Sequence, residues 1–149
     1  MPTKQNDHDL EPLLTNQQNQ LNLLFGQGDG IDSKALGILG ANVAIIIFIN
    51  QAAAGLSFWQ YVMLYSPFVF SLALDVLSIW PRRYKAPGID LDTQDHFLGM
   101  NRKTLILQLL SNTQTAIKHN AALNKKRLRY CLGSVLLTGL GFLALLAIL

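Results

Sequence analysis

Three long apolar runs dominate this sequence, at residues 35–54, 56–80 and 130–149. The first and the third contain no charged side chain, and the second contains only Asp75. At a helical rise of about 1.5 Å per residue, a run of about 20 residues crosses a hydrocarbon core of about 30 Å. The runs therefore predict an all-α integral membrane protein with three transmembrane helices.

Burial of these helices in a soluble core is the alternative. The chain has 149 residues, of which 50% are hydrophobic and only 14% are charged. The remaining residues are too few to cover three such helices, so the composition favours a bilayer. The polar, acidic N-terminal residues do not resemble a signal peptide, and the single cysteine, Cys131, excludes an intramolecular disulfide.

The basic residues predict the orientation. The link between the second and third runs holds ten Lys and Arg residues, whereas the short link around Gly55 holds no charge. The positive-inside rule therefore places the long link in the cytosol. A multi-pass protein with a cytoplasmic N-terminus follows, in which the first two spans form a hairpin whose tip lies outside.

The N-terminal residues differ in composition from the rest of the chain. Residues 1–30 are polar and rich in Asn and Gln, with a weak leucine stripe that predicts a short helix. We expect this helix to stop at the glycines Gly26, Gly28 and Gly30. Residues 31–149 then form the membrane domain.

A long cytosolic helix is predicted before the third run. The Pro81 ring ends the second span, and the Asp95 carboxylate is the best-placed cap for a new helix. No proline follows, and no glycine occurs between Gly99 and Gly133. The cytosolic helix should therefore cover about 95–130 and continue directly into the third span. Its many amide side chains either pair between copies of the chain or face water.

Polar residues inside the spans are candidates for a functional site. Asn42 and Asn50 lie in the first run and Asp75 in the second, and such groups look for partners on other helices. An acid within an apolar run is a functional candidate by default. These residues predict either a polar path through the membrane or packing within the bundle. For Asp75, a structural ion pair with Arg82 or Lys34 is a further alternative.

Four basic residues precede the third run: Lys125, Lys126, Arg127 and Arg129. Such a juxtamembrane basic patch ordinarily sets topology and attracts anionic lipid, at about 1 kcal/mol per charge. Binding of a phosphate-bearing signal is a second possibility.

The sequence contains no pattern typical of an active site. Asp90, Asp92, Asp95 and His96 lack the glycine and distal glutamate of a calcium loop and the second histidine of a zinc site. Neither a nucleophile motif nor a phosphate-binding glycine loop is present. We therefore expect no enzymatic activity, no cofactor, no metal and no nucleic-acid partner.

Short motifs at three points resemble a known family. The first span begins with Asp32-Ser33-Lys34-Ala35, the second closes with Pro81-Arg82, and the cytosolic helix ends with the segment from Lys125 to Arg129. From about Leu21 to Leu149 the chain resembles the Pycsar transmembrane effector family of bacterial antiphage defence. In that resemblance Asp32, Lys34 and Ala35 fix the start of the first span.

The resemblance implies a bacterial inner-membrane protein that oligomerises with copies of itself. Such an effector responds to a nucleotide or infection signal by perturbing or permeabilising the membrane. The residues outside the spans are too few for a conventional cyclic-nucleotide-binding barrel. We therefore expect either the cytosolic helix and its basic residues or a separate sensor protein to receive the signal.

Two other functions fit the same sequence. The first is a membrane adaptor that anchors a soluble partner through the cytosolic helix, on the face that carries Leu105, Leu109 and Leu123. The second is a small constitutive channel or transporter subunit, which the lack of an internal repeat disfavours.

Overall fold

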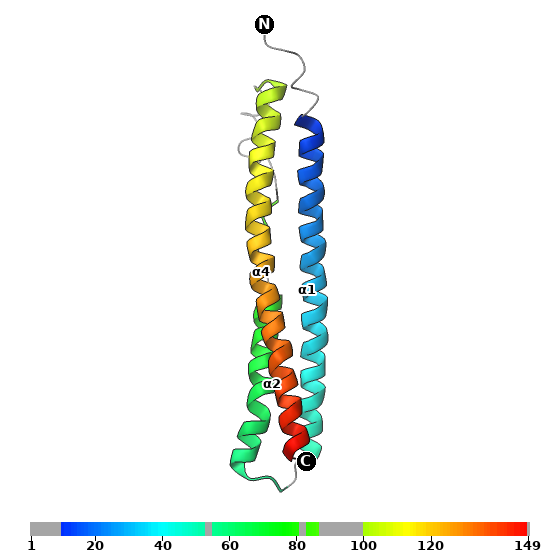
Figure 1. Ribbon diagram of the computed structural model, residues 1–149, viewed down its shortest axis with the longest axis vertical. Helices are drawn as coiled ribbons and strands as arrows, with labels where there is room; N and C mark the ends of the chain where they lie inside the picture. The colour runs from blue at the N-terminus through cyan, green and yellow to red at the C-terminus, as the bar shows by residue number, and fades with distance from the viewer. Residues whose placement is uncertain (1–9, 53–54, 81–82, 87–99, 149) are drawn as a thin grey trace. The chain divides into compact units, whose positions relative to one another are not determined.

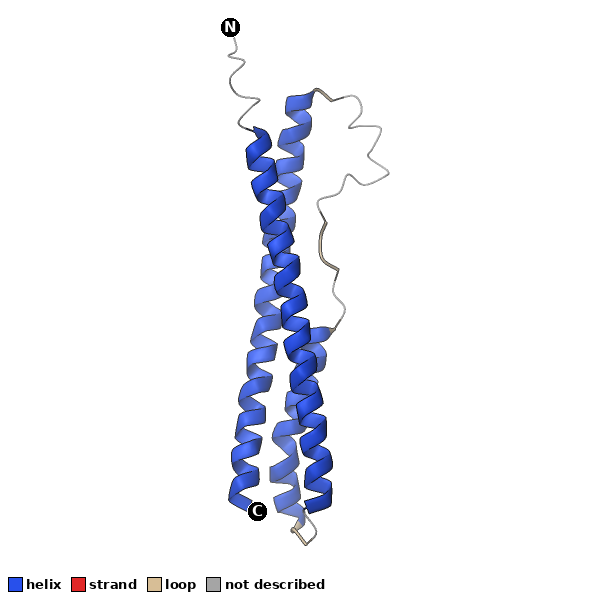
Figure 2. Ribbon diagram, turned by 90° about the vertical axis from the view of Figure 1, so that its right-hand side faces the viewer, coloured by secondary structure: helices blue, strands red, loops and turns tan. Residues whose placement is uncertain are grey.

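The described part of the chain is built of three helices. The computed structural model describes residues 10–52, 55–80, 83–86 and 100–148. These residues form α1 (Leu10–Ala52), α2 (Phe58–Ile79) and α4 (Arg102–Ile148), with no strand among them (Figures 1 and 2). All three helices are long and apolar enough to cross a membrane. The prediction of an all-α chain with three such helices is confirmed.

Helix α1 is longer than the sequence pattern predicted. It runs without interruption for 43 residues and passes through Gly26, Gly28 and Gly30. The predicted helix end at these glycines is therefore wrong. A glycine inside a helix costs only about 1 kcal/mol relative to alanine. Packing on both sides offsets that cost, because Leu21 and Ile31 are each buried.

Helix α2 lies within the second predicted span. Before it, Gly55 adopts φ +104, a left-handed conformation that a residue without Cβ reaches readily. The backbone N–H of Ser57 donates to Gln60 Oε1 over 2.8 Å at the helix start. Pro67 is accommodated inside the helix. Pro81, the predicted terminator, lies outside the described residues.

Helix α4 confirms that one continuous helix leads into the third apolar run. It covers 47 residues, from Arg102 to Ile148. Asn101 caps its start, because the Thr104 N–H donates to Asn101 Oδ1 over 2.9 Å. The predicted helix start at about residue 95 is wrong for this helix, because Met100 and Asn101 are not helical. The predicted cap, Asp95, lies outside the described residues.

The chain divides into two compact units. The first comprises Met1–Gln27 and Arg82–Leu123, and the second comprises Gly28–Pro81 and Asn124–Leu149. In the first unit, Asn120 links α4 to the described segment 83–86. Its side chain accepts a hydrogen bond from the Lys85 N–H and donates one to the Lys85 carbonyl, each over 2.9 Å. The rings of Phe25 and Tyr84 meet edge to face.

The second unit packs parts of α1 and α4 against α2. One apolar cluster consists of Ile49, Leu64, Phe68 and Leu145. The other consists of Ile31, Ala35 and Cys131, with Ile38 and Ile79 packed against it. Polar side chains also lie between the three helices of this unit.

Candidate functional site

A cluster of polar side chains is buried among the three apolar helices of the second unit. Its members, taken from α1, α2 and α4, are Asn42, Ser71, Asp75, Ser134 and Thr138. The side chains of Asn42, Ser71, Asp75 and Ser134 are all 0% exposed. Every helix of the unit therefore contributes to one water-excluded polar cluster.

Asn42 is the member from α1 and bonds to both other helices. Its amide nitrogen donates to Ser71 Oγ over 2.7 Å and to Asp75 Oδ2 over 3.3 Å. Its amide oxygen accepts a hydrogen bond from Thr138 Oγ1 over 2.9 Å. The structure thus brings together Asn42 and Asp75, two of the three predicted intramembrane residues.

Ser71 connects α2 to α4. Its hydroxyl lies 2.7 Å from Ser134 Oγ and 2.8 Å from Thr138 Oγ1. It also donates to the Ser134 carbonyl over 3.0 Å. We did not predict Ser71, Ser134 and Thr138 as site residues from the sequence. Their spacing was the available signal, because Ser71 with Asp75 and Ser134 with Thr138 are each four residues apart on one helix face.

Asp75 is incompletely satisfied within this cluster. Oδ2 accepts the long bond from Asn42, but Oδ1 is buried and has no hydrogen-bond partner among the described residues. A buried carboxylate oxygen without a donor costs free energy. Of the alternatives for Asp75, the pair with Lys34 is not formed in the described part of the chain, and Arg82 lies outside it. Among the described residues, the cluster therefore contains an acid that forms no ion pair.

Asn50 does not join the cluster. Its side chain is exposed, and its amide oxygen accepts a hydrogen bond from the Tyr65 hydroxyl. This contact links α1 to α2 near the hairpin. Asn50 therefore does not share a hydrogen bond with Asn42 or Asp75.

A second polar contact of this unit lies at the start of the first predicted span. Arg127 is 3% exposed and forms an ion pair with Asp32. Its Nε donates to the Ser78 carbonyl over 2.8 Å, and Ser78 Oγ donates to the Arg127 carbonyl over 3.3 Å. One guanidinium therefore connects all three helices. Burial lowers the pKa of Arg127, and the Asp29 carboxylate opposes that shift.

The four basic residues before the third run are thus not equivalent. Arg127 points inward, whereas Lys125, Lys126 and Arg129 are exposed. The Lys126 ammonium lies 5.9 Å from the centroid of the Tyr130 ring, a cation–π distance. Only three of the four predicted patch residues face outward.

The residues of the Asp-x-Lys-Ala motif have three different environments. Asp32 forms the ion pair with Arg127, Ala35 is fully buried in the apolar cluster with Ile31, and Lys34 is exposed. The motif therefore holds α1 against the other two helices through two of its residues.

No group of three or more His, Cys, Asp or Glu that fits a metal ion occurs among the described residues. Asp90, Asp92, Asp95 and His96, which we considered as ligands and rejected, lie outside them.

The fold and the cluster define an all-helical chain with three helices apolar enough to cross a membrane and a buried polar site between them. A scan against models of protein families and searches of curated proteins and of solved structures found no match to this chain. The resemblance to the Pycsar transmembrane effectors stays a prediction.

Proposed function

We propose that this chain is a multi-pass protein of the bacterial inner membrane that assembles as a homo-oligomer and perturbs or permeabilises that membrane. The distribution of polarity in the second unit supports membrane insertion. Large apolar side chains such as Phe48, Phe70 and Leu136 are exposed, while Asn42, Ser71 and Asp75 are buried. Lipid tails would cover such an apolar exterior, and the polar groups would be satisfied between helices.

The unpartnered oxygen of Asp75 is the observation that carries an active role. A helix bundle that only anchors a protein gains nothing from a buried acid with an oxygen to which no described residue donates. Acids of this kind within membrane helices mark ion or proton pathways and other functional sites. We therefore assign Asp75 and Asn42 to a polar path that forms when the helices repack.

Several copies are needed for such a path. Within one copy, the polar side chains bond to one another, and Asn42, Ser71, Asp75 and Ser134 are fully buried. A pore lined by these groups requires helices from neighbouring copies. The amide-rich part of α4 carries the exposed amide Gln114, a polar group of the kind that can fix the pairing of helices between copies.

The role in antiphage defence and the nucleotide signal rest on the resemblance alone. The exposed cations Lys125, Lys126 and Arg129 are suited to a phosphate-bearing signal and lie directly before the third run. A separate sensor protein that acts on the first unit is the alternative receiver.

Membrane potential in living cells tests this function. Bacteria that express the chain at a controlled level are compared with and without phage infection. We expect depolarisation that requires infection and is lost in Asp75→Asn, Asp75→Ala and Asn42→Leu. Val76→Ala changes an exposed neighbour in the same helix and should depolarise like the unchanged chain.

Two further measurements are needed to interpret the membrane potential. Membrane fractions show whether each variant is inserted at the same level, and the particle mass in nanodiscs shows the number of copies. A steady potential on infection with inserted chain present, or a strictly monomeric chain in nanodiscs, contradicts the proposal.

An adaptor that anchors a soluble partner is the second candidate. A groove of about 260 Å³ in the first unit favours it, lined by Gln20, Leu23, Leu24, Gln27, Ile117 and Ala121. Leu23 is 67% exposed there, so a partner helix would bury it. An adaptor tolerates Asp75→Asn and Asn42→Leu but loses its partner in Leu23→Asp. An effector, by contrast, loses depolarisation in Asp75→Asn and Asn42→Leu.

A further inference from the structure

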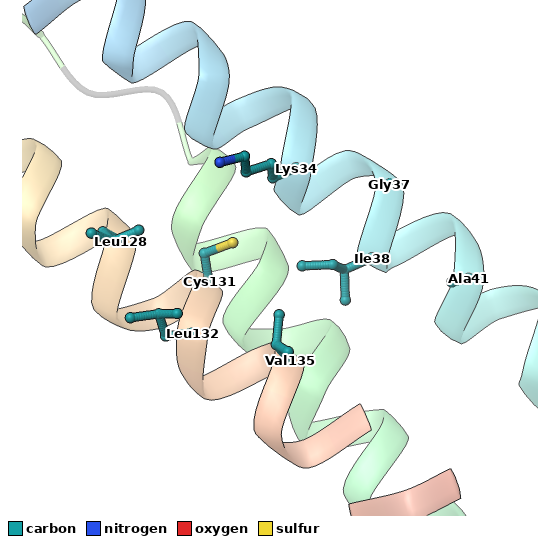
Figure 3. A pocket seen from close by; sticks show the side chains of 8 residues that line it. All are labelled: Lys34, Gly37, Ile38, Ala41, Leu128, Cys131, Leu132 and Val135. Carbon is teal, nitrogen blue, oxygen red and sulfur yellow. The ribbon is translucent and has the colours of Figure 1, made fainter. Parts of the chain in front are cut away.

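An apolar groove lies between α1 and α4 in the second unit (Figure 3). It has a volume of about 450 Å³ and is open to the surface. Its lining consists of Lys34, Gly37, Ile38, Ala41, Leu128, Cys131, Leu132 and Val135. All but Lys34 are apolar or lack a side chain, so the groove accepts an apolar occupant with one charged or polar end.

Small residues on α1 leave the groove unfilled. Gly37 and Ala41 are one turn apart on the face that lines it. A Cβ added at Gly37 would meet no atom within 4 Å. An apolar side chain or acyl chain placed against these walls would gain dispersion contacts with both helices. An occupant that fills this space therefore stabilises both helices.

The charged end of the groove is positive. Lys34 lies one turn before Gly37, and Figure 3 shows its ammonium group extending from α1 at one end of the groove, on the same side as Cys131. Lys34 forms no ion pair in the described part of the chain, and the Asp32 carboxylate is paired with Arg127. On the other wall, Lys125 precedes Leu128 by one turn. This end is therefore complementary to an anion.

Aromatic residues mark the depth of this end. Ile79 packs against the cluster of Ile31, Ala35 and Cys131, which places the end of α2 level with Lys34. Trp80 follows Ile79 directly and is 61% exposed. Exposed tryptophan beside Lys and Arg is typical of the headgroup layer. The groove therefore runs from headgroup depth, at Lys34, into the hydrocarbon layer, at Val135.

We propose that this groove binds one anionic phospholipid. Its acyl chain lies against Gly37, Ala41 and Val135, and the Lys34 ammonium binds its phosphate. This assignment rests on the membrane insertion proposed above, but it requires neither permeabilisation nor an infection signal. A second copy of the chain is the competing occupant, because small residues four apart also allow close helix contact. The cation at the end of the groove favours the lipid, because the lining of the groove contains no carboxylate that the same face of a second copy could offer to Lys34.

Native mass spectrometry of the full chain tests the proposal. The protein is released from nanodiscs that contain equal amounts of phosphatidylglycerol and phosphatidylcholine, and retained lipids are counted. We expect one retained phosphatidylglycerol per chain. Lys34→Gln should lower the preference for phosphatidylglycerol over phosphatidylcholine about fivefold, the factor expected for one juxtamembrane charge. Gly37→Leu should remove retention of both lipids, because its side chain fills the groove.

Matched variants serve as controls. Gly40→Leu adds the same side chain at an exposed glycine outside the groove, where a Cβ also meets no atom within 4 Å. Lys118→Gln removes an exposed charge from the cytosolic part of α4. Both should retain lipid like the unchanged chain.

Several results overturn the proposal. One is equal retention of the two lipids by the unchanged chain, and another is undiminished retention in Gly37→Leu. A third is a change in copy number in Gly37→Leu without loss of lipid, because this result would identify the groove as a contact between copies. Release of the chain from membranes by alkaline carbonate removes the premise of insertion and overturns both proposals. Lipid retention by a chain that does not depolarise cells contradicts the proposed function alone.

Discussion

The Asp75 side chain combines complete burial with an oxygen that has no donor among the described residues. Burying an unpaired ionisable group opposes folding, whereas a neutral group of the same shape carries no such charge penalty. A residue that lowers stability in this way is typical of a functional site, where activity requires a group that the fold alone disfavours.

Asp75→Asn should therefore stabilise the isolated protein. The amide keeps an oxygen to accept the hydrogen bond from Asn42, and it removes the ionisable group. We expect the free energy of unfolding to rise by about 1 kcal/mol, because the variant no longer buries an ionisable group, while its amide nitrogen takes the place of Oδ1. Thermal melting in a mild detergent measures the change, with Val76→Ala as a control at an exposed neighbour that should change the melting temperature little. A lower melting temperature for Asp75→Asn would mean that the carboxylate stabilises the cluster.

Helix α4 approaches Phe68 of α2 so closely at Gly141 that the position has no room for a side chain. A Cβ at this position would lie 2.7 Å from Phe68 Cζ, and Phe68 is itself fully buried. Gly141→Ala should cost about 1 to 3 kcal/mol of stability, as overpacking in a filled core does. Gly139→Ala, two residues earlier, meets no atom within 4 Å and should be neutral or slightly stabilising. Thermal melting compares the two, and Phe68→Leu should restore the stability of Gly141→Ala.

At the scale of the elements, Arg127 holds α4 to both other helices of its unit. Arg127→Gln removes the pair with Asp32 and the bond to the Ser78 carbonyl. Breaking a buried pair costs about 3 to 5 kcal/mol, but the Asp32 side chain is 36% exposed, so we expect about 2 kcal/mol. Arg127→Lys should restore little, because an ammonium does not supply the guanidinium fork that reaches both acceptors.

Arg129→Gln is the matched control for that prediction. Arg129 is exposed two residues away, so its replacement should change the melting temperature little. Equal losses for the two variants would show that charge near the third run, rather than the inward contacts of Arg127, sets the stability.

The helices of this chain were more predictable than the contacts between them. The length and hydropathy of the three runs are sufficient to predict three apolar helices. The lack of proline before and within the third run is sufficient to predict that α4 is long and continuous. The end predicted at Gly26 failed because a glycine lowers helix propensity without preventing a helix that is packed on either side. The residues next to a glycine in the sequence do not reveal whether the helix on either side of it will be packed.

The candidate site was predictable in part for a related reason. Asn42 and Asp75 stand out because amide and acid are rare in apolar runs. Ser71 and Ser134 do not, because a serine in such a run commonly bonds to its own helix. Arg127 looks like its three basic neighbours in the sequence, and only the position of α2 and Asp32 turns it inward.

For the molecule as a whole, the distribution of charge predicts which end of the second unit faces the cytosol. Ser57 lies in the uncharged hairpin between the first two spans, whereas Lys125 belongs to the basic segment before the third. Translocating a cluster of cations is disfavoured, so Ser57 should face outward and Lys125 inward. The proposed function needs this orientation, because a nucleotide signal made in the cytosol would reach only the inner side.

Single cysteines introduced at these two positions test the orientation. Both positions are exposed, and Cys131→Ala removes the native thiol, which is buried. In intact cells, a membrane-impermeant maleimide should label Ser57→Cys and not Lys125→Cys, and lysis should make both reactive. The opposite pattern would place the exposed cations outside the cell, where a cytosolic signal does not reach them. Protection of neither position in intact cells would mean that the chain does not hold one fixed orientation, because each face of the membrane would then carry copies of both ends.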